Sequence, residues 1–249
     1  MKDNILRLIE YIKESNRIVF FGGAGVSTES GVPDFRSEDG LYNQNNLSFD
    51  RFPPEYLLSH DCLINHPAAF FPFCRQKLDV RNVLPNVTHK ALARMEEMRK
   101  LSAVITQNID GLHQKAGSKK VIELHGSMEA GYCMSCGKKH PGDCLFETKE
   151  VIPRCSCGGI VRPDIVLYEE NLSDDAVAAA LDAVRNADML IVGGTSLSVY
   201  PAANFVYEFF GDHLVVINKE NLPVTLSDES DLFIQSSLGD VFREIEKIL

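Results

Sequence analysis

The sequence predicts an α/β fold: a Rossmann-like open parallel sheet with helices on both faces, a small inserted cysteine-rich module and a helical excursion. Short apolar runs that end in polar or glycine residues recur along the chain, and segments with helical spacing separate them. This alternation is typical of a mostly parallel sheet. Two stretches interrupt it: residues of about 38–85 are rich in Pro, Phe, Asn and Tyr, and residues 127–160 hold five cysteines.

The first 15 residues predict an amphipathic helix, because Ile5, Leu8, Ile9 and Ile12 recur at helical spacing. This segment lacks the continuous apolar core and the small-residue cleavage site of a signal peptide. No window approaches the roughly 18 apolar residues that span a bilayer. We therefore expect a cytoplasmic protein with no membrane partner, whose seven cysteines are thiols or metal ligands rather than disulfides.

Four apolar runs predict buried parallel strands, at the start of residues 17–31 and within 101–110, 187–197 and 213–218. The glycine-rich turn after the first run is expected to lead into a helix, and further helices are expected at 89–101 and 174–187. Ligands of such sheets bind at the carboxyl ends of the strands. The polar residues that end these runs lie there.

The composition is that of a soluble globular protein, with 45% apolar and 24% charged residues in a chain of 249. This length suits one large domain with a smaller insertion. The formal net charge of −10 argues against direct binding of nucleic acid or an anionic membrane. An acidic surface would instead favour basic, lysine-bearing partners.

The segment FGGAGVSTESGVPDFR, residues 21–36, follows the first predicted strand. Glycines at this place let backbone N–H groups approach a pyrophosphate at a helix N-terminus. The spacing is not GxGxxG, so the loop alone can equally be a tight turn. Its tail, GVPDFR, adds a carboxylate, an aromatic ring and a guanidinium, a set for which a dehydrogenase would have no use there.

Four further polar segments follow predicted strands: TQNIDGLH (106–113), ELHGS (123–127), GGTSLSVYPA (193–202) and INKE (217–220). Each also has a structural interpretation. Asp110 or Asn108 can cap a helix, and a single histidine beside a glycine, such as His125, is usually structural. The spacing of these residues leaves both interpretations open.

The cysteines of residues 127–160 form a CxxC pair, Cys133 and Cys136, and a second pair, Cys155 and Cys157. Four thiolates suit a closed tetrahedral zinc site with a structural role. The segment has little apolar periodicity and cannot bury much core, so a metal is the expected source of its stability. Cys62 and Cys74 have apolar neighbours in sequence and are expected to be buried packing residues.

The motifs GAGVS, GVPDFR, TQNID, LHG, the cysteine cluster, GTSL and IN together resemble the motif set of the sirtuin (Sir2-type) NAD-dependent protein deacylases, in the same order and from about residue 20 to 241. The resemblance implies an NAD-dependent protein-lysine deacetylase that acts on acetyl-lysine proteins or peptides. NAD⁺ would be consumed as a co-substrate, giving nicotinamide, O-acetyl-ADP-ribose and free lysine. We expect an NAD-binding domain in residues 1–126 and 161–249, with the excursion at about 38–85, and a zinc module in 127–160.

The resemblance also implies roles for individual residues. Phe35 would shield the ribose carbon that nicotinamide leaves, Arg36 would face the phosphates, Asp110 would accept from the carboxamide and Asn218 would hold the adenosine ribose. The implied NAD contacts are Gly22, Ala24, Gly25, Ser27, Thr28, Asp34, Phe35, Arg36, Gln107, Asn108, Ile109, Asp110, His125, Gly194, Thr195, Ser196, Asn218, Lys219, Asp240 and Val241.

The implied catalytic residues are His125, Asn108 and Asp110. His125 would be the general base that takes a proton from a ribose hydroxyl. An imidazole titrates near neutrality, and such a proton transfer typically contributes about 10²- to 10⁴-fold to the rate.

The second cysteine pair departs from the family pattern, which usually has CxxC where this chain has CSC. Cys144 or His140 could therefore replace one of the four zinc ligands. The four cysteines remain the predicted set, because a CxC turn can still present two sulfurs.

The segments 161–170 and 196–202 resemble the two strands between which sirtuins bind an acyl-lysine peptide, through backbone pairing that accepts many sequences. The implied peptide contacts are Val166, Tyr168, Glu169, Ser198, Val199 and Tyr200. The family often has FGE where this chain has YEE. Some relatives that prefer succinyl-lysine carry a Tyr-x-x-Arg pair where Phe71 and Cys74 stand, so acetyl or another neutral acyl group is expected.

Two other functions remain open at this stage. A mono-ADP-ribosyltransferase would use the same NAD pocket with a different acceptor. A zinc-ribbon binding module would sense NAD⁺ without turnover. An NAD-dependent dehydrogenase is disfavoured, because GxGxxG and an acidic residue about 20 positions beyond it are lacking, and cysteine catalysis is disfavoured by the metal-like spacing.

Overall fold

The computed structural model describes residues 2–34, 40, 51–198, 202–222, 226 and 230–248. Its larger sheet has the strand order β3-β2-β1-β7-β8-β9, and all neighbouring strands are parallel. The strands are β1 (Ile18–Gly22), β2 (Leu101–Thr106), β3 (Val121–Glu123), β7 (Met189–Gly193), β8 (His213–Asn218) and β9 (Leu232–Gln235). This open parallel sheet confirms the predicted fold class.

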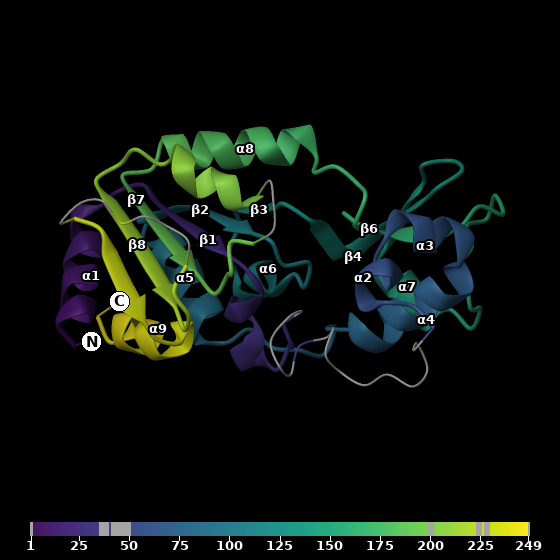
Figure 1. Cartoon of the computed structure of the whole chain (residues 1–249), viewed down its shortest axis with the longest axis horizontal. Helices are drawn as coiled ribbons and strands as arrows, with labels where there is room; N and C mark the ends of the chain where they lie inside the picture. Colours follow the sequence, from purple (N-terminus) through teal and green to yellow (C-terminus); the bar gives the residue numbers. More distant parts are fainter. Residues whose placement is uncertain are drawn as a thin grey trace.

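Helices cover both faces of this sheet (Figure 1). One face packs on α1 (Lys2–Glu14), α5 (Val87–Glu97) and α9 (Leu238–Glu246), and the other on α8 (Asp174–Arg185) and the 3₁₀ helix η3 (Ala202–Glu208). Successive residues of a strand face opposite sides, so Phe20 lies in the first core and Phe21 in the second. Because both faces are covered, the strands are continuously apolar.

Three predicted helices are present with small shifts at their ends. The N-terminal helix buries Leu8, Ile9 and Ile12 against the sheet. The helix expected at 89–101 is α5, which begins earlier because the side chain of Asn86 caps it. The helix expected at 174–187 is α8, which ends at Arg185.

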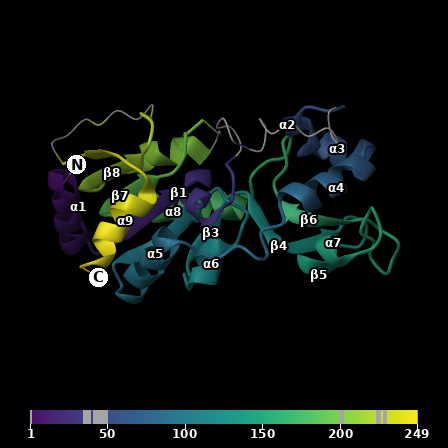
Figure 2. The same cartoon turned by 90° about the horizontal axis from the view of Figure 1, so that it is seen from below.

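A second, antiparallel sheet has the order β5-β4-β6, formed by β4 (Gly126–Cys133), β5 (Lys139–Pro141) and β6 (Val161–Ile165). Short helices surround it: α2 (Pro54–Leu57), α3 (His60–Asn65), α4 (Pro67–Lys77) and α7 (Asp143–Glu147). Figure 2 shows this group beside the larger sheet, joined to it through β4 and β6.

The excursion and the cysteine-rich segment, which the sequence presents as two separate interruptions, share one apolar core. Phe70 and Phe73 of α4 pack in the same cluster as Met128 of β4 and Val161 of β6. The predicted boundary at residue 160 remains a prediction, and β6, assigned there to the larger domain, pairs with β4 of the small sheet.

The order of the parallel strands determines where a ligand can bind. Strand β1 lies between β2 and β7, so the connections that leave β1 and β7 diverge to opposite sides. A crevice therefore opens beyond the carboxyl ends of these two strands. No helix in the described ranges combines the length and the apolar character that crossing a membrane requires.

Two buried histidines lie beside each other on α5 and the next helix along the chain. His89 of α5 and His113 of α6 (Leu112–Ala116) have ring centroids 4.7 Å apart, and both residues are almost wholly buried. Burial lowers the pKa of His89 to about 4. Burial and the neighbouring His89 lower the pKa of His113 to about 3. Both imidazoles are therefore neutral in the folded protein well below the pH at which an exposed histidine is protonated.

We expect the pair to make the fold acid-sensitive. As pH falls below about 6.5, these two histidines bind protons in the unfolded chain but stay neutral in the folded protein. The free energy of unfolding therefore falls until the pH reaches the pKa values of the folded state. At pH 5 the loss is about 2 kcal/mol for each histidine. Denaturant unfolding measured at pH 7.5 and at pH 5 should give a smaller difference in the free energy of unfolding for His113→Leu than for the wild type. His66→Gln, at an exposed histidine, should leave it unchanged, and an equal difference in all three proteins would contradict this origin.

Candidate functional site

The glycine-rich loop contacts the end of β7 at backbone distance. The N–H of Gly25 donates to the carbonyl of Gly194 over 2.8 Å. A Cβ atom on Gly25 would lie 2.7 Å from the Cα of Gly194, so no side chain fits between them. This contact brings the loops after β1 and β7 together at the crevice. The two backbones approach so closely there that only glycine fits at the point of contact.

The helix expected directly after the glycine turn is absent, and this prediction was wrong. Two 3₁₀ turns stand there instead, η1 (Ala24–Val26) and η2 (Thr28–Ser30). The second ends at Gly31, whose φ of +87° stops further helical turns. The loop therefore keeps its glycines and hydroxyls at the crevice instead of leading into a long helix.

Polar side chains from two strand ends meet beside this loop. The hydroxyl of Ser27 donates to Oδ2 of Asp110 over 2.6 Å, and Nδ2 of Asn108 donates to the same hydroxyl oxygen over 3.0 Å. Oδ1 of Asp110 accepts from the N–H of Leu112 over 2.9 Å. Burial raises the pKa of Asp110, while the bonds from Ser27 and Leu112 lower it.

A small cavity opens next to these side chains. The glycine loop and the 106–110 segment supply Ala24, Ser27, Asn108, Ile109 and Asp110. The rest of the wall consists of Val32 and Pro33 of the GVPDFR tail and of Lys77, Leu78 and Val80, which sequence reasoning missed. Most of that wall comes from the helical excursion, and no local motif signals a contact made across so many residues.

His125 lies between β3 and β4, at the edge of the same crevice. Its Nδ1 is 2.9 Å from the carbonyl oxygen of Gln107. A carbonyl only accepts, so Nδ1 carries the proton and Nε2 keeps its lone pair. Burial lowers the pKa of His125, and the bond to Gln107 opposes this shift. The ring is therefore neutral, oriented and half-buried, as a general base requires.

Further bonds join His125 to the neighbouring strands. The side-chain amide of Gln107 donates to Oγ1 of Thr195 over 3.0 Å, which links the ends of β2 and β7. The carbonyl of His125 accepts from the N–H of Val166 over 2.9 Å. The ring of His125 is thus held by the segment after β2, and its backbone by the segment after β6.

The other predicted NAD contacts lie in the glycine loop, at the ends of β7 and β8 or at the start of α9. Thr28 donates to the carbonyl of Gly25, Ser196 shares a hydrogen bond with Ser198, and Asn218 donates to the carbonyl of Glu220. Asp240 is paired with Arg243. Val241 has no exposed surface, because it packs in the core beneath the sheet.

Several predicted residues lie outside the cavity or outside the described residues. Asp34 ends a described range, while Phe35 and Arg36 lie outside the described residues, as do Val199 and Tyr200. Phe71 and Cys74, expected near the acyl group, are buried in the core of the small module. Neither lines the cavity beside Asp110, to which α4 contributes Lys77.

The predicted peptide strip is partly occupied by the chain itself. The N–H of Tyr168 donates to the carbonyl of Leu58, and the carbonyl of Tyr168 accepts from the N–H of His60. The next residue, Glu169, has a φ of +75° where the family often has glycine. Its carboxylate accepts from the N–H of Asp61. A peptide would have to pair with the opposite edge of this segment.

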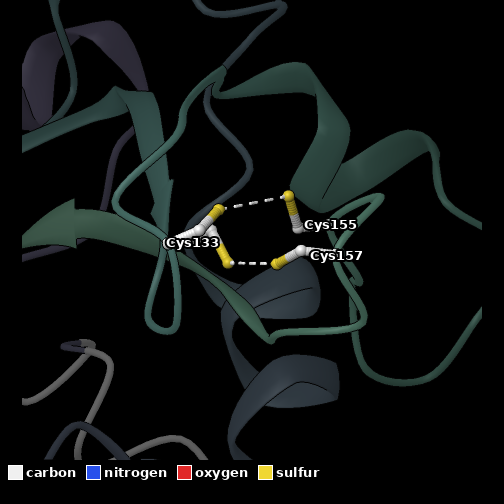
Figure 3. A group of neighbouring side chains, drawn as sticks. Cys133, Cys155 and Cys157 are labelled. Atoms are coloured by element: carbon white, nitrogen blue, oxygen red, sulfur yellow. Dashed lines mark hydrogen bonds between the residues drawn. The ribbon is translucent and has the colours of Figure 1, made fainter.

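The four cysteine sulfurs gather at one end of the small sheet (Figure 3). Sγ of Cys133 is 3.5 Å from that of Cys157, and Sγ of Cys136 is 3.8 Å from that of Cys155. All four atoms lie within 4.8 Å of one another. Zinc–sulfur bonds of about 2.3 Å in a tetrahedron place sulfurs roughly 3.8 Å apart, so the geometry fits a structural zinc site.

The electrostatics of the cluster also favour a cation. The backbone N–H of Cys136 lowers the pKa of Cys133 to about 6, and that of Cys157 lowers the pKa of Cys155 to about 7. At Cys136 the backbone N–H of Lys138 is outweighed by the neighbouring Cys157 and Cys133, which raise the pKa to about 11. Thiolates this close repel one another unless a metal neutralises them. Within the described part of the chain, the group at metal-binding distance consists of these four cysteines, without Cys144 or His140.

The strand order, the glycine contact at the crevice and the four-cysteine cluster define a Rossmann-like protein, of the kind that binds dinucleotides, with an insertion whose cysteines could hold a structural metal. The sequence model of the Sir2 family matches residues 23–201, and the chain belongs to that family.

Named relatives and solved structures agree with this assignment. An NAD-dependent protein deacetylase of Clostridium acetobutylicum is 51% identical over 245 residues, which cover 98% of each chain. A protein of the same name from Clostridium perfringens is 52% identical over 248 residues, covering 98% of this chain and 99% of the relative. The structure of a Sir2 protein with a peptide and NAD⁺ is 36% identical, with a TM-score of 0.82, and covers 97% of this chain and 96% of that chain. That of Sir2 bound to an acetylated peptide is 34% identical, with a TM-score of 0.83, and covers 98% of both.

Proposed function

We propose that this protein is an NAD-dependent protein-lysine deacetylase, which consumes NAD⁺ and releases nicotinamide, O-acetyl-ADP-ribose and the deacetylated lysine. The observation that carries the proposal is the neutral, oriented imidazole of His125 at the crevice where the glycine loop, Asn108 and Asp110 converge. Relatives with about half of their residues identical over nearly their whole length bear the name of this activity.

The residues at the crevice fit a dinucleotide. The loop around Gly25 and Gly194 offers backbone groups without side chains in front of them, which suits a pyrophosphate. Thr195, Ser196 and Asn218 add hydroxyl and amide groups at neighbouring strand ends for phosphate and ribose. When bound, NAD⁺ supplies nicotinamide as a leaving group and the ribose that receives the acetyl group.

The residues around the small cavity are assigned to the nicotinamide end. Asp110 is nine-tenths buried and already accepts from Ser27 and Leu112, so its carboxylate is held in one orientation. Its remaining lone pairs can accept from a carboxamide. Ile109 and Leu78 make the adjoining wall apolar, which limits the access of water.

His125 is assigned to proton transfer. The carbonyl of Gln107 holds the Nδ1 proton, so the lone pair on Nε2 is the acceptor for a proton from a ribose hydroxyl. Burial keeps the ring neutral near pH 7. The bond from Gln107 to Thr195 restrains the segment that orients the ring.

The four cysteines are assigned to a structural zinc that stabilises the small sheet. The predicted acyl-lysine strip, Val166 with Glu169 on one side and Ser198 on the other, is retained as the substrate site. We further infer a cytoplasmic location, which the metal-like cysteine spacing supports, since disulfides are uncommon there.

The proposal is tested by incubating the purified protein with NAD⁺ and an acetyl-lysine peptide, with mass spectrometry of all products. Equal amounts of free lysine peptide, nicotinamide and O-acetyl-ADP-ribose are expected. Nicotinamide release with ADP-ribose attached to a protein, and no loss of acetyl, would instead indicate a mono-ADP-ribosyltransferase. Binding of NAD⁺ without any product would indicate a sensing module.

A further inference from the structure

Glu29 reaches from the glycine loop to a helix that is more than 200 residues away in sequence. Its Oε1 accepts from the backbone N–H of Gly239, in the first turn of α9, over 2.9 Å. Its Oε2 pairs with Nη1 of Arg243 over 3.1 Å, and Arg243 also binds Asp240 over 2.8 Å. Both carboxylate oxygens are therefore engaged by the same helix.

The helix is shaped for this contact. A Cβ atom on Gly239 would overlap Oε2 of Glu29, so a larger residue at position 239 would displace the carboxylate. The neighbouring N–H of Asp240 is capped locally by Oγ of Ser237 over 3.1 Å. Glu29 thus completes the cap of α9 from another part of the chain, where the helix dipole favours a negative charge.

The same loop is held on its other side by α5. Nδ2 of Asn86 donates to the carbonyl of Val26 over 2.8 Å and to Oγ of Ser30 over 3.0 Å. Asn86 and Glu29 therefore anchor the two 3₁₀ turns to two different helices. The residues proposed to contact NAD⁺ lie between these anchors and beside them.

The start of α9 also supports the third part of the crevice. Leu238 is buried against the glycine turn that ends β7, so close that a Cβ on Gly193 would lie 2.6 Å from its Cδ2. Because Glu29 fastens the glycine loop to α9, it fixes the position of the loop relative to the turn at Gly194. The pyrophosphate is proposed to bind at the crevice beside these two backbones, which contact each other directly.

We propose that Glu29 is a positioning residue for NAD⁺: it holds the glycine loop against α9 and so preorganises the backbone groups that would bind the dinucleotide. This inference rests on the proposed function only for the identity of the ligand. Both carboxylate oxygens of Glu29 are engaged by α9, so the role assigned to it is indirect. Its removal should weaken binding of the dinucleotide and leave the chemical step intact, because His125 is held by other bonds.

Glu29→Gln keeps the size of the side chain and removes its charge. With saturating acetylated peptide, the KM for NAD⁺ should rise about three- to fivefold, the upper part of the range that a partly exposed ion pair can supply. The kcat and the KM for the peptide should stay within about twofold. Glu244→Gln is the matched control, because it breaks a pair with Lys247 on the same helix without touching the loop.

Hydrogen exchange of the free proteins gives a second readout that needs no ligand. The N–H groups of Val26, Ser30 and Gly31 are bonded within the loop, and they should exchange faster in Glu29→Gln than in the wild type or Glu244→Gln. A variant with unchanged KM for NAD⁺ and unchanged exchange would overturn the proposal, as would a parallel loss in kcat and in peptide KM. If the wild type turned over no NAD⁺, the proposed function would fail, while the exchange data would still decide the role of Glu29.

Discussion

His125→Asn is expected to lower kcat/KM for the acetylated peptide by about 10²- to 10⁴-fold, which is the usual contribution of a general base. The asparagine amide can still donate to the carbonyl of Gln107, as the imidazole does over 2.9 Å. It cannot accept a proton near neutral pH. His125→Ala, which removes both properties, should be at least as inactive, and both variants should keep their zinc and their thermal stability.

The pH profile of the wild type supplies an independent check. The base must be neutral to act, and burial lowers the pKa of His125 below its usual value near 6.5. The rate should therefore be constant through neutral pH and fall only as pH drops below that value. His213→Ala, at a histidine stacked on Tyr11 at the amino end of β8, should behave as the wild type does. Substantial activity in His125→Asn, or an acid limb well above pH 6.5, would remove His125 from the mechanism.

Loss of the zinc site should have the second large effect. Cys155→Ser is expected to abolish stoichiometric zinc binding and to lower the Tm by roughly 10 °C or more. Zinc contributes about 10–16 kcal/mol to small zinc-finger peptides, and about 2–4 °C of Tm is lost for each kcal/mol in a chain of this size. Melting curves and metal analysis would measure both quantities.

Activity should fall with the metal because the cluster and His125 share two strands. Strand β4 begins directly after His125, and Cys133 at its far end pairs with Val161 of β6, which leads back to the Val166 bond with His125. Cys144→Ser is the matched control, because this thiol lies in the same module but outside the cluster. Equal zinc loss in both variants would show that the ligand set is wrong.

The fold class was predictable because its signals are local. Each buried parallel strand is a continuous apolar run, and each flanking helix has its own apolar stripe, so periodicity alone indicated an open sheet with helices on both faces. The cysteine cluster was also predictable, because the four cysteines that form it stand in two closely spaced pairs in the sequence. The helix predicted after the glycine loop was wrong, because Gly31 ends the helical turns before they can extend.

Contacts between distant segments were beyond this kind of reasoning. The excursion and the zinc segment turned out to share one core, and Lys77 and Leu78 face the cavity beside Asp110. Nothing in the sequence near Glu29 distinguishes it from an ordinary surface residue, and only the folded structure shows its contact with α9. The residue types, the strand ends and the order of the motifs could be predicted from the sequence, because each depends only on residues that are close together in the chain. The tautomer of His125, the closing wall of the cavity and the anchoring of the loop depend on packing between remote segments, which follows from burial of the whole core.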